Sequence, residues 1–435
     1  MFPGRPSGVG WLSGVLDAMP LLFGTRIVTS HPASDALLSD APPSSSAPNP
    51  SLPRAVSTAE DARAAARDLF EGLCGRNPAA AAELEMVLVF CSAHYDRVEL
   101  AAALAELFGP VPVVGCTTAG EITPFGYAAG SLVGIGFPRA DFTIATQRID
   151  DLDRFSIAEA PRVLRSLMEQ RDVALAARAD AFPDHGSFAF LMIDGMSRAE
   201  EMVVSALHSV LMDIPLFGGS AGDELRFERT FVLHEGRFHT NAAVLMLVTT
   251  ARRFVVFRTE HFVASDAKMV VTGADPQRRI VTEINAEPAG REYARMVGLE
   301  GEPLTPLIFA AYPVVVRVGG EYHVRSIQKV NDDESLTFYC AIDEGIVLTV
   351  ARGVDPVENL EEMMRKLAAE VGGPPDLVLG CDCILRRLEL EQRQLKHVMS
   401  AALARHNVIG FCAYGEQYNA MHVNQTFTGV AIGAR

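Results

Sequence analysis

The chain has little of what nucleic-acid-binding and membrane-spanning proteins are built from. Its 435 residues include 38 Lys and Arg against 54 Asp and Glu, a formal net charge of −16, which argues against binding to nucleic acid and to anionic membrane surfaces. Tryptophan occurs once, at Trp11, so aromatic stacking platforms are not a feature of this chain. The apolar stretch 11–23 is broken by Asp17 and Pro20 and is too short to span a bilayer. We therefore expect no nucleic-acid partner and no membrane partner.

The signatures of the common enzyme classes are also missing. The sequence has no HExxH, GxSxG, Walker or Rossmann pattern, and no nucleophile stands at an informative spacing from a base and an orienting acid. The chain is therefore predicted not to be an enzyme. It also lacks a kinase core, a transmitter helix and a cyclase signature, so a signalling role requires a second polypeptide.

Cysteine is present in an odd number. The seven cysteines lie at positions 74, 91, 116, 340, 381, 383 and 412, several of them in apolar, strand-like runs. This pattern is typical of reduced thiols and predicts a cytoplasmic protein. No Cys-x-x-Cys-His motif is present, which excludes covalently attached haem of the c type.

The composition divides the chain into an extension and a folded part. Residues 1–56 contain a Pro-, Ser- and Ala-rich stretch at 38–53, which predicts a disordered, low-complexity N-terminal extension. The whole chain has 49 % hydrophobic residues, and the part after the extension is long enough for two domains. The pattern changes near residue 251, so we predict an α/β domain over 57–250 and a second α/β domain over 251–435.

The most informative feature that is present is a threefold internal repeat. An apolar strand, an amphipathic helix, a second short strand and a glycine turn that is followed by an acidic residue occur in this order three times. The first repeat covers 86–121, the second 188–223 and the third 376–416. We call their ends the first (115–121), second (218–223) and third (410–416) glycine turns. In each repeat antiparallel strands are predicted after the turn.

The repeat predicts the fold class and one location for a ligand. A strand–helix–strand unit of about 30 residues fits a parallel right-handed crossover, so we predict a two-domain α/β protein with mixed sheets. Ligands of open α/β sheets bind beyond the carboxyl ends of strands. The predicted ligand-binding residues are therefore Gly115, Thr117, Glu121, Gly219, Ser220, Asp223, Glu416 and Gln417. The alternative is that the glycines serve only tight turns and close packing.

Several segments resemble the FIST sensory domain family. Residues 114–122 and 217–223 resemble the two glycine motifs of its N-terminal half, and 410–417 with 424–427 resembles the end of its C-terminal half. Residues 270–272 and 283–289 with Tyr293 resemble the junction segment. The resemblance covers roughly 58–433. It implies a bacterial sensory input module that binds a small ligand, such as an amino acid, and acts in signal transduction.

One branch of this family implies a more specific function. Residues 257–263 and 381–387 resemble the haem-binding, nitric-oxide-sensing branch, whose partners are histidine kinases of two-component systems or cyclic-di-GMP enzymes, that is, diguanylate cyclases and phosphodiesterases. The resemblance thus implies non-covalent haem b, nitric oxide as the ligand and regulation of such a partner in trans. A homodimer is also compatible with it.

His261 is the candidate haem ligand. It follows an apolar strand, and Phe257 and Phe262 beside it can supply apolar walls for the macrocycle. A neutral imidazole is the usual protein ligand to a haem that binds a diatomic gas. The alternative haem ligands are His239, His94 and His422. Without a cofactor, His261 would be a hydrogen-bonded histidine of the core.

A second candidate site is formed by cysteines. Cys381 and Cys383 are two residues apart in a strand-like run and therefore point to one side, and Cys412 lies in the third glycine turn. These thiols predict either a redox pair or part of a zinc site. Only three thiols and one histidine, His397 or His422, can be counted toward four zinc ligands, and inert buried thiols remain the alternative.

Overall fold

The computed structural model describes residues 52–75, 77–178, 185–318 and 320–435. Most of the expected extension 1–56 therefore lies outside the described residues, together with Trp11 and the apolar stretch 11–23. Its last residues are ordered, because β1 (Arg54–Ser57) pairs with a later strand from Arg54↔Ile135 to Ser57↔Leu132. The folded part thus begins slightly earlier than predicted.

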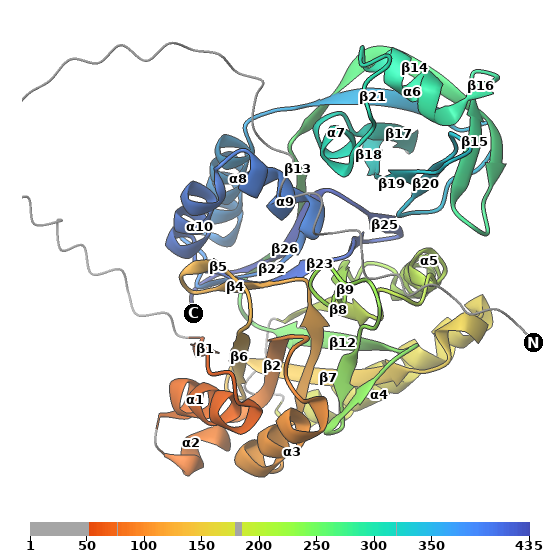
Figure 1. Cartoon of the computed structure of the whole chain (residues 1–435). Helices are drawn as coiled ribbons and strands as arrows, with labels where there is room; N and C mark the ends of the chain where they lie inside the picture. The colour runs from red at the N-terminus through yellow and green to blue at the C-terminus, as the bar shows by residue number, and fades with distance from the viewer. Residues whose placement is uncertain (1–51, 76, 179–184, 319) are drawn as a thin grey trace, which may run out of the picture. The chain divides into compact units, whose positions relative to one another are not determined.

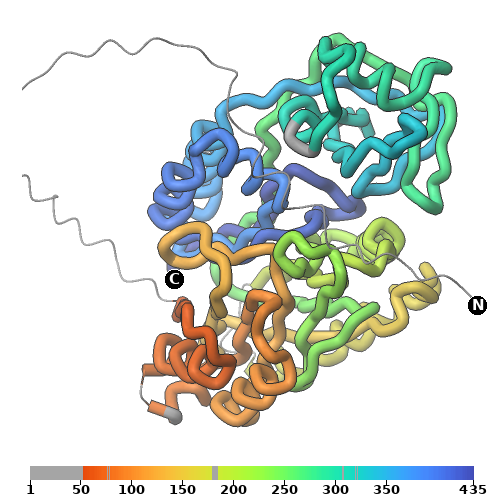
Figure 2. Tube along the Cα trace, in the orientation of Figure 1, coloured from red at the N-terminus to blue at the C-terminus, as the bar shows by residue number. Residues whose placement is uncertain are grey.

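The described chain folds as three similar modules (Figures 1 and 2). Each has an outer strand, a helix, the predicted strand–helix–strand unit, a hairpin and a final strand. The first module contains β1, α1 (Ala62–Cys74), α2 (Pro78–Ala81), β2 (Leu84–Ser92), α3 (Arg97–Phe108), β3 (Val113–Thr118), β4 (Glu121–Thr123), β5 (Gly126–Ala128) and β6 (Leu132–Pro138). The second contains β7 (Phe142–Ile149), two 3-10 turns (Leu152–Arg154 and Ile157–Glu159), α4 (Ala160–Ala176), β8 (Gly186–Ile193), α5 (Glu200–Leu211), β9 (Leu216–Ser220), β10 (Val232–His234), β11 (Arg237–His239) and β12 (Ala243–Thr250).

The third module is interrupted by an insert. It consists of β13 (Phe254–Glu260), α8 (Pro356–Val371), β22 (Leu377–Cys383), α9 (Ile384–Gln392), α10 (Lys396–Arg405), β23 (Val408–Ala413), β24 (Glu416–Tyr418), β25 (Met421–Val423) and β26 (Thr426–Ile432). The insert, residues 262–353, holds β14 (Phe262–Asp275), β15 (Ile280–Ile284), β16 (Glu287–Pro288), α6 (Ala289–Met296), α7 (Pro306–Ala311), β17 (Val314–Val318), β18 (Glu321–Arg325), β19 (Ile327–Val330), β20 (Leu336–Phe338) and β21 (Val347–Gly353). The strands of the insert form one sheet around a hydrophobic core of their own.

The predicted mixed α/β class and the parallel crossovers are confirmed. β2 and β3, β8 and β9, and β22 and β23 pair in parallel, and β6, β12 and β26 pair antiparallel to the first strand of each unit. The helix of the third unit is two helices, α9 and α10, where one was predicted. Side-chain caps start several helices, since the Asp96 and Asp355 carboxylates each accept two backbone N–H groups.

The hairpin of each module belongs to the sheet of another module. The hairpin β4–β5 extends the third sheet beside β23, β10–β11 extends the first sheet beside β3, and β24–β25 extends the second sheet beside β9. Figure 1 shows β4 and β5 next to β22 and β23. The regions 57–250 and 251–435 therefore share two of their sheets, and inner-face residues of all three modules form one core.

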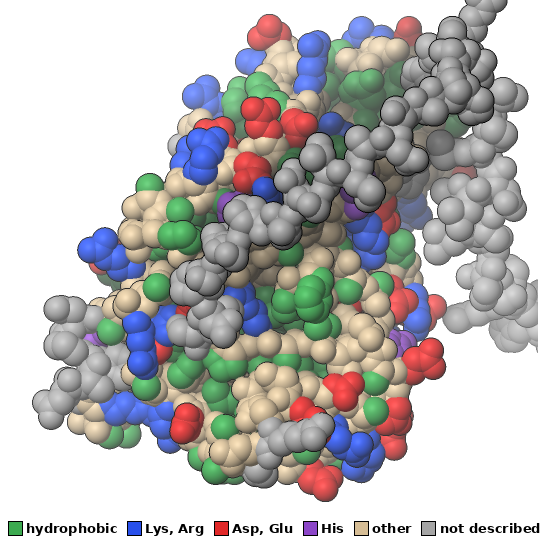
Figure 3. All heavy atoms as spheres, turned by 90° about the vertical axis from the view of Figure 1, so that its left-hand side faces the viewer, with side chains coloured by type: hydrophobic (Ala, Val, Ile, Leu, Met, Phe, Trp, Pro, Cys, Tyr) green, Lys and Arg blue, Asp and Glu red, His purple; other side chains and the backbone are tan. Residues whose placement is uncertain are grey.

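One face of the described chain combines hydrophobic side chains with charges of both signs (Figure 3). On the face turned to the viewer in Figure 3, acidic and basic side chains are interspersed. Among the described residues, no helix is both long and apolar enough to cross a membrane.

Candidate functional site

The three glycine turns meet and are joined by backbone hydrogen bonds. The Gly222 N–H donates to the Thr117 carbonyl at 3.0 Å, and the Ala119 N–H donates to the Cys412 carbonyl at 2.9 Å. The Ser220 N–H donates to the Gly415 carbonyl at 2.8 Å, which closes the ring. The structure therefore brings the predicted ligand-binding residues of all three repeats into one buried region.

The glycines of this region are required by close packing. A Cβ atom on Gly115 would lie 2.0 Å from the Val89 carbonyl oxygen, and one on Gly218 would lie 2.2 Å from the Leu191 carbonyl oxygen. A Cβ atom on Gly219 would lie 2.6 Å from the ring of Phe411. The packing explanation of the glycines is therefore sufficient at these positions.

The polar groups of the first glycine turn bind one another. The Thr118 hydroxyl donates to one carboxyl oxygen of Glu121, and the Ser131 hydroxyl donates to the other at 2.7 Å. Thr117 Oγ1 accepts the Phe231 N–H. Burial raises the pKa of Glu121 to about 7 although these hydrogen bonds oppose it. Both carboxyl oxygens of Glu121 and the hydroxyl oxygen of Thr117 thus have hydrogen-bond partners within the protein.

Asp223 in the second turn has a structural role. Its carboxylate accepts the N–H groups of Phe227, Glu228 and Arg229 at 2.8–2.9 Å, and the hydroxyl of Tyr414 donates to it. Asp223 therefore fixes the loop after the second turn and attaches it to the third turn.

The third turn and the β24–β25 hairpin after it differ, because several buried polar atoms there have no partner. Oε1 of Glu416, Oε1 of Gln417 and both amide atoms of Asn424 make no hydrogen bond, and all three residues are fully buried. The remaining atoms are engaged: the Thr426 hydroxyl donates to Glu416, and Gln417 Nε2 donates to Ser220 Oγ. Burial raises the pKa of Glu416 well above its usual range. An unpartnered buried polar group costs about 1–3 kcal/mol, so four such atoms in one cluster require an explanation, such as a bound water or ligand.

His422 connects this cluster to a cavity. Its Nδ1 lies 3.2 Å from Gln417 Nε2, and burial lowers its pKa to about 4, which keeps the imidazole neutral. Together with Tyr414 it lines a cavity of about 120 Å³. The other walls come from Gly195, Met196, Arg198, Glu200 and Phe227 of the second module and from Arg278, Arg279, Gln328, Thr337, Phe338 and Tyr339 of the insert.

The cavity has charges of both signs and aromatic walls. The Arg279 guanidinium lies 3.3 Å from Glu200 and 2.8 Å from Glu201. Burial raises the pKa of Glu200 to about 7, and the rings of Phe227 and Tyr414 stack at 4.5 Å. A cavity of about 150 Å³ holds a benzene-sized molecule, so this one suits a small polar ligand.

His261 lies apart from this cavity, at the point where the chain enters the insert. It is 1 % exposed; Nε2 lies 2.7 Å from Glu389 Oε2, and Nδ1 accepts from Arg386 Nη1 at 2.7 Å. The Arg386 Nε in turn donates to Asp382, and the hydroxyl of Tyr127 donates to the same carboxylate. Burial lowers the pKa of His261, so the imidazole is neutral at pH 7.

This arrangement bears on the predicted haem site. Both ring nitrogens of His261 are engaged, and the residue lines none of the described cavities. Phe262 packs on the His261 ring at 4.1 Å, and Phe257 packs on Phe427 at 5.4 Å. The described conformation thus does not fit a haem on His261. Of the alternatives, His94 is exposed beside Ser92 and His239 lies against Arg148.

The three candidate thiols lie on two faces of one sheet. Cys412 pairs in register with Asp382, whereas Cys381 and Cys383 are the neighbours of Asp382 along β22. Because side chains alternate along a strand, Cys412 points away from the side that Cys381 and Cys383 share. All three are buried, burial raises the pKa of each thiol, and no metal-binding group of His, Cys, Asp or Glu occurs among the residues described.

Most residues of the cavity wall have no signal in the sequence. The predicted residues Glu416 and Gln417 lie in the cluster behind His422, whereas Glu200, Arg278, Arg279 and Tyr339 of the wall itself are not among the predicted residues. Arg278 and Arg279 follow the Asp275-Pro276 turn, and nothing in their local pattern indicates that the insert faces the third module. Asn424 lies in a segment that the resemblance identified, and its polar side chain in an apolar strand region was the available signal.

The fold defines a class: an α/β protein of three similar modules, with a cavity of about 120 Å³ at the third one. The FIST N domain matches residues 85–287 and the FIST C domain matches residues 289–419. Together these matches cover more than half of the chain, and the chain belongs to the FIST family. FIST domains are sensory domains of signal transduction, as the resemblance implied.

Two further comparisons place the chain among known proteins. It is 20 % identical over 391 residues to the uncharacterized protein MJ1623 of Methanocaldococcus jannaschii, a match that covers 79 % of this chain and 73 % of the relative. Among solved structures, a cyanuric acid hydrolase matches 88 % of this chain and 99 % of its own, with 12 % identity and a TM-score of 0.32.

Proposed function

We propose that this chain is a non-enzymatic sensory module that binds a small polar metabolite, such as an amino acid, in the cavity beside the third glycine turn. The observation that carries the proposal is the set of unpartnered buried atoms on Glu416, Gln417 and Asn424, a cluster that His422, a residue of the cavity wall, contacts through Gln417. A ligand, or water that it orders, removes the cost of these atoms when it bonds them.

The charges of the cavity favour a zwitterion. Arg278 is exposed at the cavity wall and suits a carboxylate, while Glu200, which is also paired with Arg279, suits an ammonium group. The neutral His422 can donate or accept a hydrogen bond between them. An α-amino acid has both charges at the separation of a few bonds, which agrees with a cavity of about 120 Å³.

We further propose that the module signals through another polypeptide, namely a histidine kinase or a cyclic-di-GMP enzyme. The cavity walls come from the second module, the third module and the insert. A ligand that contacts the two modules and the insert binds more tightly to one of their relative arrangements than to another. It thereby increases the population of the arrangement that a partner protein recognises.

A thermal-unfolding screen with the standard amino acids and related small zwitterions tests this function. A ligand at 100 times its dissociation constant stabilises the protein by about 2.7 kcal/mol, so we expect one compound class to raise the melting temperature by a few degrees. Arg278→Gln should abolish the rise, whereas Arg317→Gln, the same change at an exposed site of the insert outside the cavity, should not. A screen without any rise, or a rise that persists in Arg278→Gln, contradicts the proposal.

A second candidate function is haem-based sensing of nitric oxide, and one observation favours it. Glu389 hydrogen-bonds one nitrogen of His261, and a carboxylate in this position orients many metal-binding imidazoles. Haem would supply the iron that binds the gas, and His261 would hold it. Arg386 argues against haem binding, because its guanidinium donates a hydrogen bond to the other ring nitrogen of His261. This function therefore requires Arg386 to move away from the imidazole.

An absorption spectrum after haem reconstitution decides between the two functions. The haem hypothesis predicts a stoichiometric Soret band that shifts with nitric oxide in the native protein and is lost or altered in His261→Ala. An unchanged band in His261→Ala moves the ligand to His239, His94 or His422. Without stoichiometric haem in either protein, the gas-sensing function fails and the metabolite-binding function remains.

A further inference from the structure

The cavity beside the third glycine turn gathers three arginines on a chain that is strongly acidic. Arg198 comes from the loop before α5, and Arg278 and Arg279 come from the β14–β15 turn of the insert. The Arg279 guanidinium donates to the Arg198 carbonyl at 3.4 Å, so the two segments touch here. The whole chain has a net charge of −16, and its composition therefore does not explain a local excess of cations.

One of the three arginines is neutralised within the protein. The Arg279 guanidinium lies 2.8 Å from Glu201 and 3.3 Å from Glu200. Burial raises the pKa of Glu200 to about 7, so this carboxyl group is about half ionised at neutral pH. The two acids thus balance the charge of Arg279 and leave little negative charge for the other two arginines.

Arg198 and Arg278 have no such partners. Both residues are exposed, and within the described part of the chain neither guanidinium makes a hydrogen bond or an ion pair. Asp333 interacts electrostatically with Arg278, but the hydrogen bonds that its carboxylate accepts come from Ser335. Two cations at the mouth of one cavity repel each other, and an anion between them replaces this repulsion by attraction.

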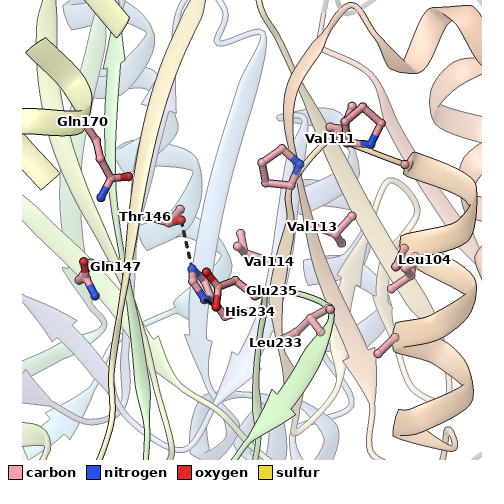
Figure 4. A pocket seen from close by; sticks show the side chains of 16 residues that line it. Leu104, Val111, Val113, Val114, Thr146, Gln147, Gln170, Leu233, His234 and Glu235 are labelled. Atoms are coloured by element: carbon pink, nitrogen blue, oxygen red, sulfur yellow. Dashed lines mark hydrogen bonds and ion pairs between the residues drawn. The ribbon is translucent and has the colours of Figure 1, made fainter. Parts of the chain in front are cut away.

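Another groove of the molecule differs in its charge. It lies between the first and second modules, has a volume of about 560 Å³ and is lined by one residue with a formal charge at neutral pH, Glu235 (Figure 4). The Glu235 carboxylate lies 3.7 Å from the Arg148 guanidinium, and His234 Nε2 lies 3.2 Å from Thr146 Oγ1. The charge of this groove is thus balanced within the protein, in contrast to the charges of Arg198 and Arg278.

We propose that the ligand of the cavity beside the third glycine turn is an acidic amino acid, whose α-carboxylate binds Arg278 and whose second carboxylate binds Arg198. This inference rests on the function proposed above and narrows its ligand from any small zwitterion to one with a net negative charge. The α-amino acid part fits the cavity of about 120 Å³, and the side chain extends to the mouth, where Arg198 is exposed. Each carboxylate then meets one guanidinium, whose planar fork matches its geometry.

Two pairs of nearly isosteric ligands test the inference on the full-length protein. Isothermal titration calorimetry compares aspartate with asparagine and glutamate with glutamine, because the members of each pair differ by one negative charge and little else. In at least one pair we expect the acid to bind about fivefold more tightly than the amide, which is typical of a partly exposed ion pair. Amides that bind as tightly as their acids overturn the inference.

A variant of Arg198 assigns the discrimination between acid and amide to the mouth of the cavity. The ratio of the two affinities should fall to about one in Arg198→Gln. It should stay about fivefold in the control Arg165→Gln, which makes the same change of charge at an exposed position of α4 outside the cavity. A ratio that Arg198→Gln does not lower also overturns the inference.

The outcomes separate this inference from the function on which it rests. If a neutral amino acid binds with an affinity that falls in Arg278→Gln, while neither acid binds more tightly than its amide, the amino-acid site stands and the acidic ligand is excluded. If no amino acid binds to the native protein, the proposed function itself fails.

Discussion

Asn424 is the residue whose structure is hardest to explain without a ligand. It is fully buried, and neither its amide nitrogen nor its amide oxygen has a partner. We therefore predict that Asn424→Leu, which has a similar volume, raises the free energy of unfolding by about 1–2 kcal/mol while it abolishes ligand binding at the cavity. Urea denaturation of the ligand-free proteins measures the first effect, and the thermal screen measures the second.

Asn331 provides the matched control for this prediction. Its side-chain nitrogen donates to Ser335 Oγ at 2.9 Å and to Thr337 Oγ1 at 3.0 Å. Asn331→Leu should therefore lower the free energy of unfolding by about 1–2 kcal/mol. If Asn424→Leu is destabilising to the same degree as Asn331→Leu, Asn424 is bonded inside the protein and the argument for a ligand loses its basis.

Glu121 predicts a dependence of stability on pH. Burial raises its pKa to about 7, above the value of about 4.3 in an unfolded chain. The contribution of protonated Glu121 to the free energy of unfolding is complete below pH 4. It falls as the carboxyl group ionises in the unfolded chain, and it is lost as the pH rises through 7. Between pH 5 and pH 8 this group should lower the free energy of unfolding by about 2 kcal/mol.

Glu121→Gln tests this dependence, because the amide oxygen can still accept from Ser131 while its nitrogen faces Thr118. The decrease in stability between pH 5 and pH 8, measured by urea denaturation, should be smaller in the variant by about 2 kcal/mol. Parallel pH profiles of native and variant protein would show that Glu121 does not titrate in this range.

At the residue scale the sequence predicted the turns but not their chemistry. Glu121, Asp223 and Glu416 all follow glycine turns, yet the first two are bonded within the protein and the third retains an unpartnered oxygen. This difference depends on what packs above each turn. The insert beside the third turn is distant in sequence, so no local pattern could reveal it.

At the scale of elements, the prediction was most accurate where the determinants are local. The strand–helix–strand units follow from apolar runs and helical spacing, and the structure confirms all three. The destination of each hairpin was not predicted. The strands Glu121–Thr123 and Val232–His234 pair with strands from other modules, and an edge strand offers the same backbone groups to any partner. Only the packing of the whole chain selects one.

The parallel strands themselves explain why the repeated glycine is required. A Cβ atom on Gly218 would lie 2.2 Å from the Leu191 carbonyl oxygen, far below a normal contact distance. Gly218→Ala should therefore lower the free energy of unfolding by about 2 kcal/mol or more, as measured by urea denaturation.

Gly353 is the matched control for Gly218. It ends β21, and a Cβ atom there meets nothing closer than 3.7 Å. Gly353→Ala should change stability by at most about 0.5 kcal/mol. Equal effects of the two substitutions would mean that the strands β8 and β9 separate easily at Gly218.

At the scale of the whole molecule, the insert is the feature that the sequence concealed. The change of pattern near residue 251 predicts a domain boundary there, whereas in the structure β13 completes the third sheet and the insert begins at Phe262. Phe262 and Gly353 are partners in one antiparallel pair, and the Val354 N–H donates to the His261 carbonyl at 2.7 Å. The chain thus leaves and re-enters the third module at adjacent points.

This geometry predicts that the insert can be removed. Replacing residues 262–353 by a two-residue Asn-Gly turn, which joins adjacent antiparallel strands, should leave a folded three-module core, because the insert has a hydrophobic core of its own. Circular dichroism should show a cooperative thermal transition. Ligand binding should be lost, since Arg278, Arg279 and Tyr339 are removed with the insert. Aggregation or a non-cooperative transition would contradict the independence of the core.

The most direct test of the central claim is isothermal titration calorimetry with the compound that the thermal screen selects. We predict that one molecule binds per chain of the native protein. The affinity should be at least tenfold weaker in Arg278→Gln, which corresponds to about 1.4 kcal/mol, and unchanged in Arg317→Gln. Equal heats of binding in native protein and Arg278→Gln would place the ligand elsewhere and contradict a site beside the third glycine turn.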